Sequence, residues 1–285
     1  MRYHTPASFK DASAIAAGAT GVTRYLAGGT DVLVQLRSGL VIPDDLIDLK
    51  KIPGVKDIAQ TADGGWRIGI AASGAELGAN AGLVADWPGV VEGMELVGST
   101  QVQGRATQAG NLCNGSPAAD SVPGMVAAGA TVTVTGPSGD REVAVEDIPA
   151  SPGKTTLAKG ELISAINLPA RGGHAGDAYL RFIPRTEMDI AVVGCAVSLT
   201  LDGDRIASAR VALGAVAPTV LLVAEAAEAI VGTTLDDVAL DKLAAAATAA
   251  CNPIDDKRGT IAFRKDVAGV LACRAAKIAY ERAKG

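Results

Sequence analysis

The chain of 285 residues has few aromatic side chains and no obvious metal-binding motif. Aromatic residues make up 3% of it, whereas 48% of its residues are apolar. A core of this composition is built mainly from valine, leucine, isoleucine and alanine. The four cysteines, Cys113, Cys195, Cys251 and Cys273, form no C-x-x-C pair. Their spacing argues against a zinc ribbon or an iron–sulfur cluster carried by this chain.

Histidine and positive charge are also scarce. The two histidines, His4 and His174, have no orienting partner nearby in sequence, so we expect both at the surface. The net charge is 26 − 31 = −5, which makes nucleic acid an improbable partner. No apolar run is long enough to predict a membrane span, and the N-terminus has no basic leader. The simplest location is the cytoplasm.

The length of the chain predicts two or three packed lobes. Before a glycine-rich break at residues 170–176, we expect helices at 10–17, 31–38 and 90–97, strands at 22–27, 43–49, 66–70 and 161–168, and a hairpin of 131–135 with 141–145. After the break, residues 193–201 and 207–213 alternate as an antiparallel hairpin. Three helices then follow, around residues 222–230, 237–250 and 260–282.

A glycine pair, Gly28-Gly29, follows one of the predicted strands. Glycine lets a backbone approach a ligand closely, and successive N–H groups in such a loop can bind an anion. Thr30 adds a hydroxyl group. Spacing alone, however, favours a tight turn in which Thr30 or Asp31 caps the next helix.

A second glycine-rich loop at residues 104–115 is unusually polar, with Thr107, Gln108 and Asn111 between glycines. Two such loops could hold a diphosphate from two sides. Ser116-Pro117 stands where a nucleoside triphosphatase requires Lys-Ser/Thr, and no G-x-G-x-x-G motif predicts a Rossmann site. Taken alone, Lys154, Arg181 and Arg185 are best interpreted as solvated surface charges.

In their order along the chain, these segments resemble the FAD-binding medium subunit of the molybdenum hydroxylases, the family of xanthine dehydrogenase and carbon monoxide dehydrogenase. The resemblance covers nearly the whole chain and is carried by residues 25–31 (YLAGGTD), 107–112 (TQAGNL), 114–120 (NGSPAAD), 161–163 (ELI) and 185–191 (RTEMDIA). It implies an α+β fold. A two-part N-terminal FAD-binding domain, of the type shared with vanillyl-alcohol-oxidase-like flavoproteins, would span residues 1–57 and 58–172, and a lobe of small antiparallel sheet with helices would span 173–285.

The resemblance also implies a site for noncovalent FAD, with no catalytic and no metal-binding residue. Residues 26–32 would wrap the diphosphate with backbone amides, opposite residues 107–111; Asp120 would bond the ribitol or adenosine part, and Ile163 and Arg181 would lie near the flavin ring. The motif at 185–191 would shape the lobe that covers the isoalloxazine. Ala109 stands where the family usually has glycine, and a positive φ there would strain alanine. The implied FAD-binding residues are Leu26, Ala27, Gly28, Gly29, Thr30, Asp31, Val32, Thr107, Ala109, Gly110, Asn111, Asp120, Ile163 and Arg181.

The function implied by the resemblance is electron transfer. A large molybdopterin subunit would oxidise the substrate, and a small subunit with two iron–sulfur clusters would pass electrons to FAD on this chain. An external acceptor such as NAD, oxygen or a quinone would receive them, in an expected dimer of heterotrimers. Two alternatives are a self-sufficient flavin reductase on a related fold and a scaffold subunit without flavin.

Overall fold

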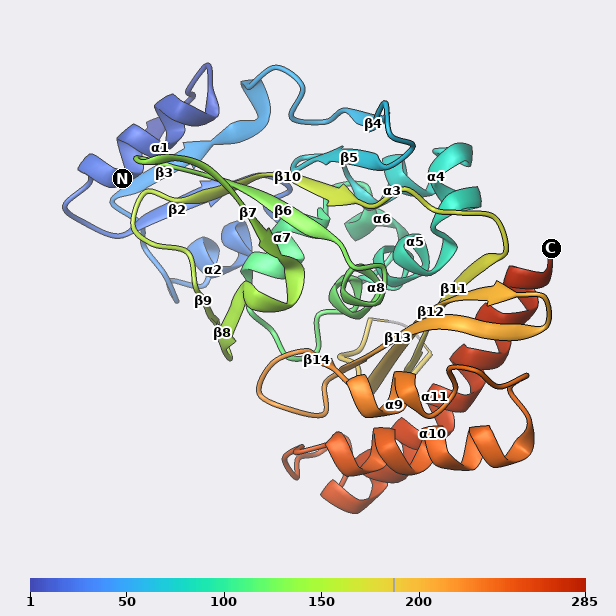
Figure 1. Cartoon of the computed structure of the whole chain (residues 1–285). Coiled ribbons are helices and arrows are strands. Elements are labelled where there is room, and N and C mark those ends of the chain that lie inside the picture. The colour runs from blue at the N-terminus through green and yellow to red at the C-terminus, as the bar shows by residue number, and fades with distance from the viewer. Residues whose placement is uncertain (187) are drawn as a thin grey trace.

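Three main β-sheets organise the computed structural model, which describes residues 1–186 and 188–285 (Figure 1). The first sheet is parallel, in the order β1-β3-β2, with β1 Arg2–His4, β2 Thr23–Leu26 and β3 Asp45–Asp48. The predicted helix is α1 (Phe9–Gly18), and the side chain of Ser8 caps it by accepting the N–H of Asp11. His4 was expected at the surface without a partner. Its Nε2 instead lies 2.8 Å from Asp45 Oδ1.

The second sheet is antiparallel and has the order β4-β5-β10-β6-β7. Its strands are β4 Ile58–Gln60, β5 Trp66–Gly69, β6 Thr131–Gly136, β7 Gly139–Ala144 and β10 Leu162–Leu168. The predicted β6–β7 hairpin is confirmed. A small hairpin of β8 (Pro149–Ser151) and β9 (Lys154–Thr155) precedes β10, and two 3-10 turns, η1 (Leu49–Lys51) and η2 (Val145–Asp147), complete this part.

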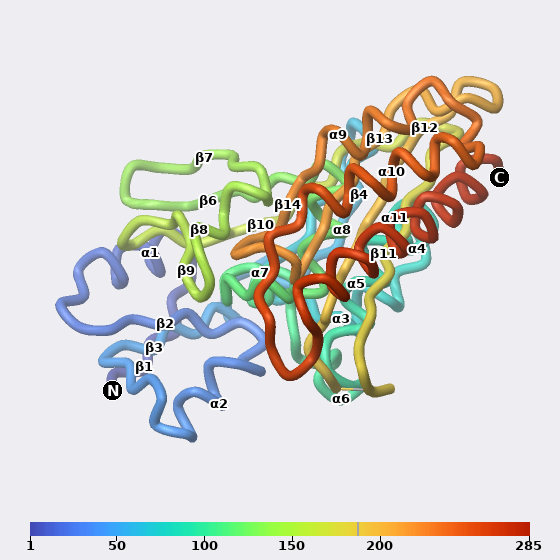
Figure 2. The backbone as a smooth tube through the Cα atoms, turned by 90° about the horizontal axis from the view of Figure 1, so that it is seen from below, coloured from blue at the N-terminus to red at the C-terminus, as the bar shows by residue number. Residues whose placement is uncertain are grey.

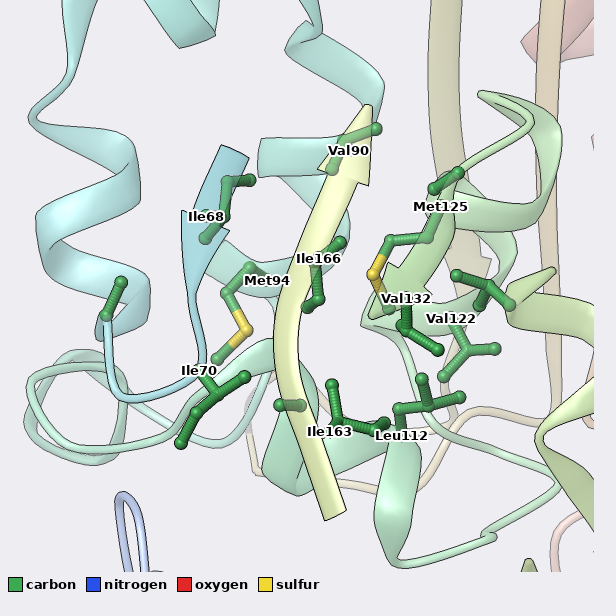
Figure 3. Packing of buried hydrophobic residues seen from close by; sticks show 14 of the residues in the cluster. Ile68, Ile70, Val90, Met94, Leu112, Val122, Met125, Val132, Ile163 and Ile166 are labelled. Atoms are coloured by element: carbon green, nitrogen blue, oxygen red, sulfur yellow. The ribbon is translucent and has the colours of Figure 1, made fainter. Parts of the chain in front are cut away.

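Six helices follow β5 before β6 begins: α3 Gly74–Gly78, α4 Ala81–Asp86, α5 Pro88–Glu95, α6 Thr100–Gln103, α7 Gln108–Cys113 and α8 Ser121–Ala127. Figure 3 shows how buried side chains of α5, α7 and α8 meet those of the second sheet. Met94, Leu112 and Met125 from the helices and Ile68 and Ile166 from the strands are almost completely buried. This packing fixes α7 against the second sheet.

The third sheet is antiparallel, in the order β11-β12-β13-β14, with β11 Ala175–Phe182, β12 Val193–Asp202, β13 Arg205–Gly214 and β14 Leu221–Leu222. The predicted β12–β13 hairpin is confirmed. The C-terminal helices are α9 Ala224–Glu228, α10 Asp237–Ala250 and α11 Ile261–Lys284, and α11 packs on β11 and β12. Figure 1 shows the sheet between α11 on one face and the helices α5 and α8 on the other, so both of its faces are covered.

Two segments differ from the sequence predictions. Residues 108–113, expected as part of a glycine-rich loop, form α7 because the Thr107 hydroxyl caps the helix. The expected break at 170–176 already contains the start of β11. Glu187 of the 185–191 motif lies outside the described residues. No helix within the described ranges is both long and apolar enough to cross a membrane.

Candidate functional site

A cavity of about 600 Å³ brings together both segments that the sequence singled out. Its walls come from β2 and the loop after it, from α7, and from residues 153–163. The volume falls within the range typical of small-molecule and cofactor sites. Eleven of the fourteen predicted site residues line it, namely Ala27, Gly28, Gly29, Thr30, Asp31, Val32, Thr107, Ala109, Gly110, Asn111 and Ile163.

The loop after β2 presents a run of free backbone donors. Within the described part of the chain, the N–H groups of Gly28, Gly29, Thr30 and Asp31 have no hydrogen-bond acceptor. Gly29 has φ +82°, a conformation that suits glycine. The helix α2 (Val32–Arg37) then begins, with the N–H of Leu33 donating to the Gly29 carbonyl. Consecutive free amides of this kind can bind an anionic group.

Helix α7 forms the facing wall. The Thr107 hydroxyl accepts the N–H of Gly110 at 3.1 Å, which satisfies one of the free donors at the start of the helix. Ala109 lies inside α7 and is not among the described residues with positive φ, so the strain expected for alanine does not arise. The backbone at this position therefore tolerates a side chain, and Ala109 contributes a methyl group to the cavity wall.

The carboxamide of Asn111 has a fixed orientation. Its Oδ1 accepts both the N–H of Ser121, at 3.2 Å, and the Ser121 hydroxyl, at 2.7 Å. These two donors identify the oxygen, so the side-chain nitrogen is the atom left to donate to a ligand. Since Asn111 lines the cavity, that donor supplements the amides of the first loop.

A hydrogen bond joins the two walls. The amide nitrogen of Asn114, the residue after α7, donates to the carboxylate of Asp31. Both residues line the cavity. The bond links the first loop to the end of α7.

Sequence reasoning gave no role to three further residues of the wall. Arg24 and Lys159 are cations that form no ion pair with a carboxylate of the described residues. Tyr25 is the sole aromatic residue among the described ones that line the cavity. Its hydroxyl is buried without a partner, and this burial raises the pKa of Tyr25. The scarcity of aromatic residues in the chain was a signal that could have singled out Tyr25.

The remaining predicted residues, Leu26, Asp120 and Arg181, do not line the cavity. Arg181 Nη1 lies 2.6 Å from Asp120 Oδ2, and the Tyr179 hydroxyl donates to Asp120 Oδ1 at 2.8 Å. Both members of the ion pair are buried, so the interpretation of Arg181 as a solvated charge was wrong. Burial raises the pKa of the Asp120 carboxyl, while Arg181 and Tyr179 oppose that rise. Leu26 is also buried.

The cavity combines free backbone amides with two cationic side chains. Within the described ranges, no group of three or more histidine, cysteine or acidic side chains is placed to hold a metal ion. Residues 1–171 match the family described as "FAD binding domain in molybdopterin dehydrogenase". The chain belongs to this family. Residues 178–279 match the "CO dehydrogenase flavoprotein C-terminal domain".

Curated relatives agree with the family. The medium chain of carbon monoxide dehydrogenase from Afipia carboxidovorans is 34% identical over 282 residues, which are 99% of this chain and 97% of the relative. The xanthine dehydrogenase FAD-binding subunit from Escherichia coli O157:H7 is 31% identical over 218 residues, covering 76% of this chain and 74% of the relative. The chain is thus a medium, FAD-binding subunit of the molybdenum hydroxylase family, as predicted, and its cofactor is FAD.

Solved structures show the same fold. Carbon monoxide dehydrogenase from Hydrogenophaga pseudoflava matches with a TM-score of 0.94 and 30% identity, over 99% of this chain and 98% of that one. Quinoline 2-oxidoreductase from Pseudomonas putida matches with a TM-score of 0.90 and 26% identity, over 100% and 98%. These matches extend through the C-terminal sheet and its helices, so the whole α+β arrangement is that of a flavoprotein subunit.

Proposed function

We propose that this chain binds FAD in the cavity between the β2 loop and α7 and passes electrons through it within a molybdenum hydroxylase. The observation that carries the proposal is the run of four free amides, Gly28 to Asp31, facing a fixed donor on Asn111. A diphosphate is the part of FAD that such a donor set recognises. When bound, FAD supplies the redox chemistry, and the protein supplies binding, orientation and electrostatics.

The wall residues take distinct roles in this proposal. The amides of the first loop donate to the diphosphate from one side, and the side-chain nitrogen of Asn111 donates from the other. Arg24 and Lys159 offset its negative charge, since neither is engaged by a carboxylate of the described residues. Ile163 provides an apolar contact for a ring.

Asp120 and Arg181 support the site from behind its wall. Their ion pair holds the start of α8, whose first residue, Ser121, bonds Asn111. Leu26 contributes by packing beneath the first loop. In this proposal these three residues position the groups that bind FAD.

The proposal extends to the wider assembly. We propose three parts, residues 1–57, 58–172 and 173–285, with the first two arranged as in vanillyl-alcohol-oxidase-like flavoproteins. The partners are a large molybdopterin subunit and a small subunit with two iron–sulfur clusters, in a dimer of heterotrimers in the cytoplasm. Support comes from the similarity of the chain to medium subunits of multi-subunit enzymes such as carbon monoxide dehydrogenase.

Flavin content and co-purification test this proposal together. The chain co-expressed with its neighbouring subunits should purify as a complex that contains stoichiometric FAD, molybdenum and iron. Asn111→Ala should weaken FAD binding about tenfold, while Asn252→Ala at an exposed position should leave it unchanged. A colourless protein that does not retain added FAD, or a flavoprotein that turns over a soluble substrate without partners, would refute the proposal.

A further inference from the structure

Asp31 places a carboxylate in the wall of the cavity, beside the proposed donors to the diphosphate. Its own N–H is the last of the free amides of the first loop, and its exposed side chain forms no ion pair with a cation of the described residues. Figures 1 and 2 show α2, which Asp31 precedes, at the end of the molecule remote from α10. A carboxylate repels a diphosphate, because both groups are anionic. It therefore weakens binding unless it makes a favourable contact with another part of the ligand.

The carboxylate of Asp31 has one oxygen that is engaged and one that is free. Oδ2 accepts a hydrogen bond from Nδ2 of Asn114, which lies 83 positions further along the chain. Within the described part of the chain, no donor is bonded to Oδ1. Asn114 also lines the cavity, so this bond orients the carboxylate within the wall and leaves Oδ1 as an acceptor.

Asp31 differs in this respect from the other acidic residue of the wall, Glu161. Both carboxylate oxygens of Glu161 accept hydrogen bonds from Arg141. Among the described residues of the wall, Asp31 is therefore the acidic side chain with an oxygen left for a ligand. FAD carries sugar hydroxyls on both sides of its diphosphate, in the ribityl chain and in the ribose. In dinucleotide sites of another fold, an acidic side chain accepts a hydrogen bond from such a hydroxyl.

We propose that Asp31 accepts a hydrogen bond from a sugar hydroxyl of FAD beside the diphosphate, and that Asn114 is a positioning residue that holds the carboxylate for it. This inference rests on the proposed function. The hydroxyl contact offsets the repulsion between the carboxylate and the diphosphate. Free amides bind any diphosphate, whereas this contact needs a sugar next to it. The Asp31–Asn114 pair thus selects a nucleotide diphosphate over an inorganic one.

Three ligands separate the sugar contact from the diphosphate contact: FAD, ADP and inorganic pyrophosphate, which has no sugar. Asp31→Ala, made in the full chain and freed of FAD, should weaken FAD binding about tenfold, because a hydrogen bond to a charged group is lost. The same variant should bind pyrophosphate at least as tightly as wild type does, because the repelling charge is gone. A loss with both FAD and ADP assigns the hydroxyl to the ribose, and a loss with FAD alone assigns it to the ribityl chain. Titration calorimetry with FAD, and competition by the other two ligands, measures these affinities.

Two further variants control for charge and for position. Asp140→Ala removes the same charge from an exposed position of β7 outside the cavity, and it should leave all three affinities unchanged. Asn114→Ala should weaken FAD binding less than Asp31→Ala does. In the double variant it should add nothing to the effect of Asp31→Ala, because Asn114 acts through Asp31. A further loss in the double variant would overturn the positioning role of Asn114.

Three results would overturn the contact itself and leave the proposed function standing. The first is unchanged or tighter FAD binding by Asp31→Ala. The second is an equal loss of affinity for pyrophosphate, which would show that the substitution damages the diphosphate loop. The third is a wild-type affinity that EDTA lowers to that of Asp31→Ala, since a divalent cation would then bridge the carboxylate and the diphosphate. A wild-type chain that binds none of the three ligands would overturn the proposed function as well.

Discussion

A β-carbon on Gly28 would lie 1.9 Å from the carbonyl oxygen of Arg105. The two backbones approach this closely because the loop after β2 packs directly against the segment that leads into α7. Gly28 is therefore needed to bring the two walls of the cavity together, in addition to any contact it makes with a cofactor. The φ of Gly28 is not positive, so its backbone conformation alone does not require glycine. The close approach of the two backbones does.

Gly28→Ala should consequently destabilise the protein even without FAD. The methyl group cannot be accommodated unless backbone moves, and overpacking of this kind costs about 1–3 kcal/mol. We expect a lower free energy of unfolding in urea and weaker FAD binding. Gly18→Ala is the control, because a β-carbon there meets nothing within 4 Å. Normal stability of apo Gly28→Ala would show that the two walls are not in contact in solution.

Sequence patterns located the first wall of the site better than the second. Gly28-Gly29 follows a strand, and strand-then-glycine is a local pattern that a sequence displays directly. The fold of residues 108–113 was hidden because glycine and asparagine are poor helix formers, while the helix depends on the Thr107 cap and on burial of Leu112. Tertiary packing overrode the local preference.

Gln108, at the start of α7, has an unsatisfied buried side chain. It is 2% exposed, and neither its oxygen nor its nitrogen has a hydrogen-bond partner among the described residues. A buried polar group without partners costs about 1–3 kcal/mol. Gln108→Met, of similar shape, should therefore raise the free energy of unfolding of the apo protein by about 1–2 kcal/mol.

Thermal unfolding of apo and FAD-bound protein measures this effect. Gln101→Met, at an exposed position of α6, should change little. A loss of stability in both states would mean that water satisfies Gln108. A loss confined to the FAD-bound state would place the amide in contact with the cofactor.

Asp45 of β3 bonds Arg2 and His4 of β1, and it makes the free energy of unfolding depend on pH in the acid range. Hydrogen bonds from Arg2 and then His4 lower the pKa of Asp45 from 3.8 to about 2. A carboxyl with a lowered pKa in the folded state stabilises the fold above its ordinary pKa, and this contribution is lost as pH falls through the folded value. The loss should therefore occur between about pH 4 and pH 2.

Asp45→Asn should be less stable than wild type at pH 7, and the difference should shrink as pH falls through this window. Urea unfolding at a series of pH values measures it, with Asp202→Asn at an exposed position as control. A difference that stays constant with pH would exclude the ion pair as its source.

Sequence patterns could not predict contacts between segments that are distant along the chain. Periodicity predicted the strands of both hairpins, because the alternation of apolar residues with small or polar ones is a local property of the sequence. It could not place Arg181 of β11 against Asp120, which is 61 residues away. An isolated arginine in sequence is most often solvated, and only the folded arrangement of α8 on β11 shows why this one is buried.

The hydroxyl of Tyr179 should contribute more to the free energy of unfolding than the hydroxyl of Tyr280. Its hydroxyl donates to the Asp120 carboxylate in a buried setting, whereas the Tyr280 hydroxyl donates to the neutral carbonyl of Asp204, at 2.7 Å. Hydrogen bonds to charged groups contribute about 1.5–3 kcal/mol, against about 0.5–1.5 kcal/mol for neutral ones. Tyr179→Phe should therefore lower the free energy of unfolding more than Tyr280→Phe does.

Since Asp120 adjoins Ser121, which holds Asn111, Tyr179→Phe should also weaken FAD binding, and Tyr280→Phe should not. Equal losses of stability with unchanged FAD affinity in both variants would disconnect the Asp120 pair from the cofactor site.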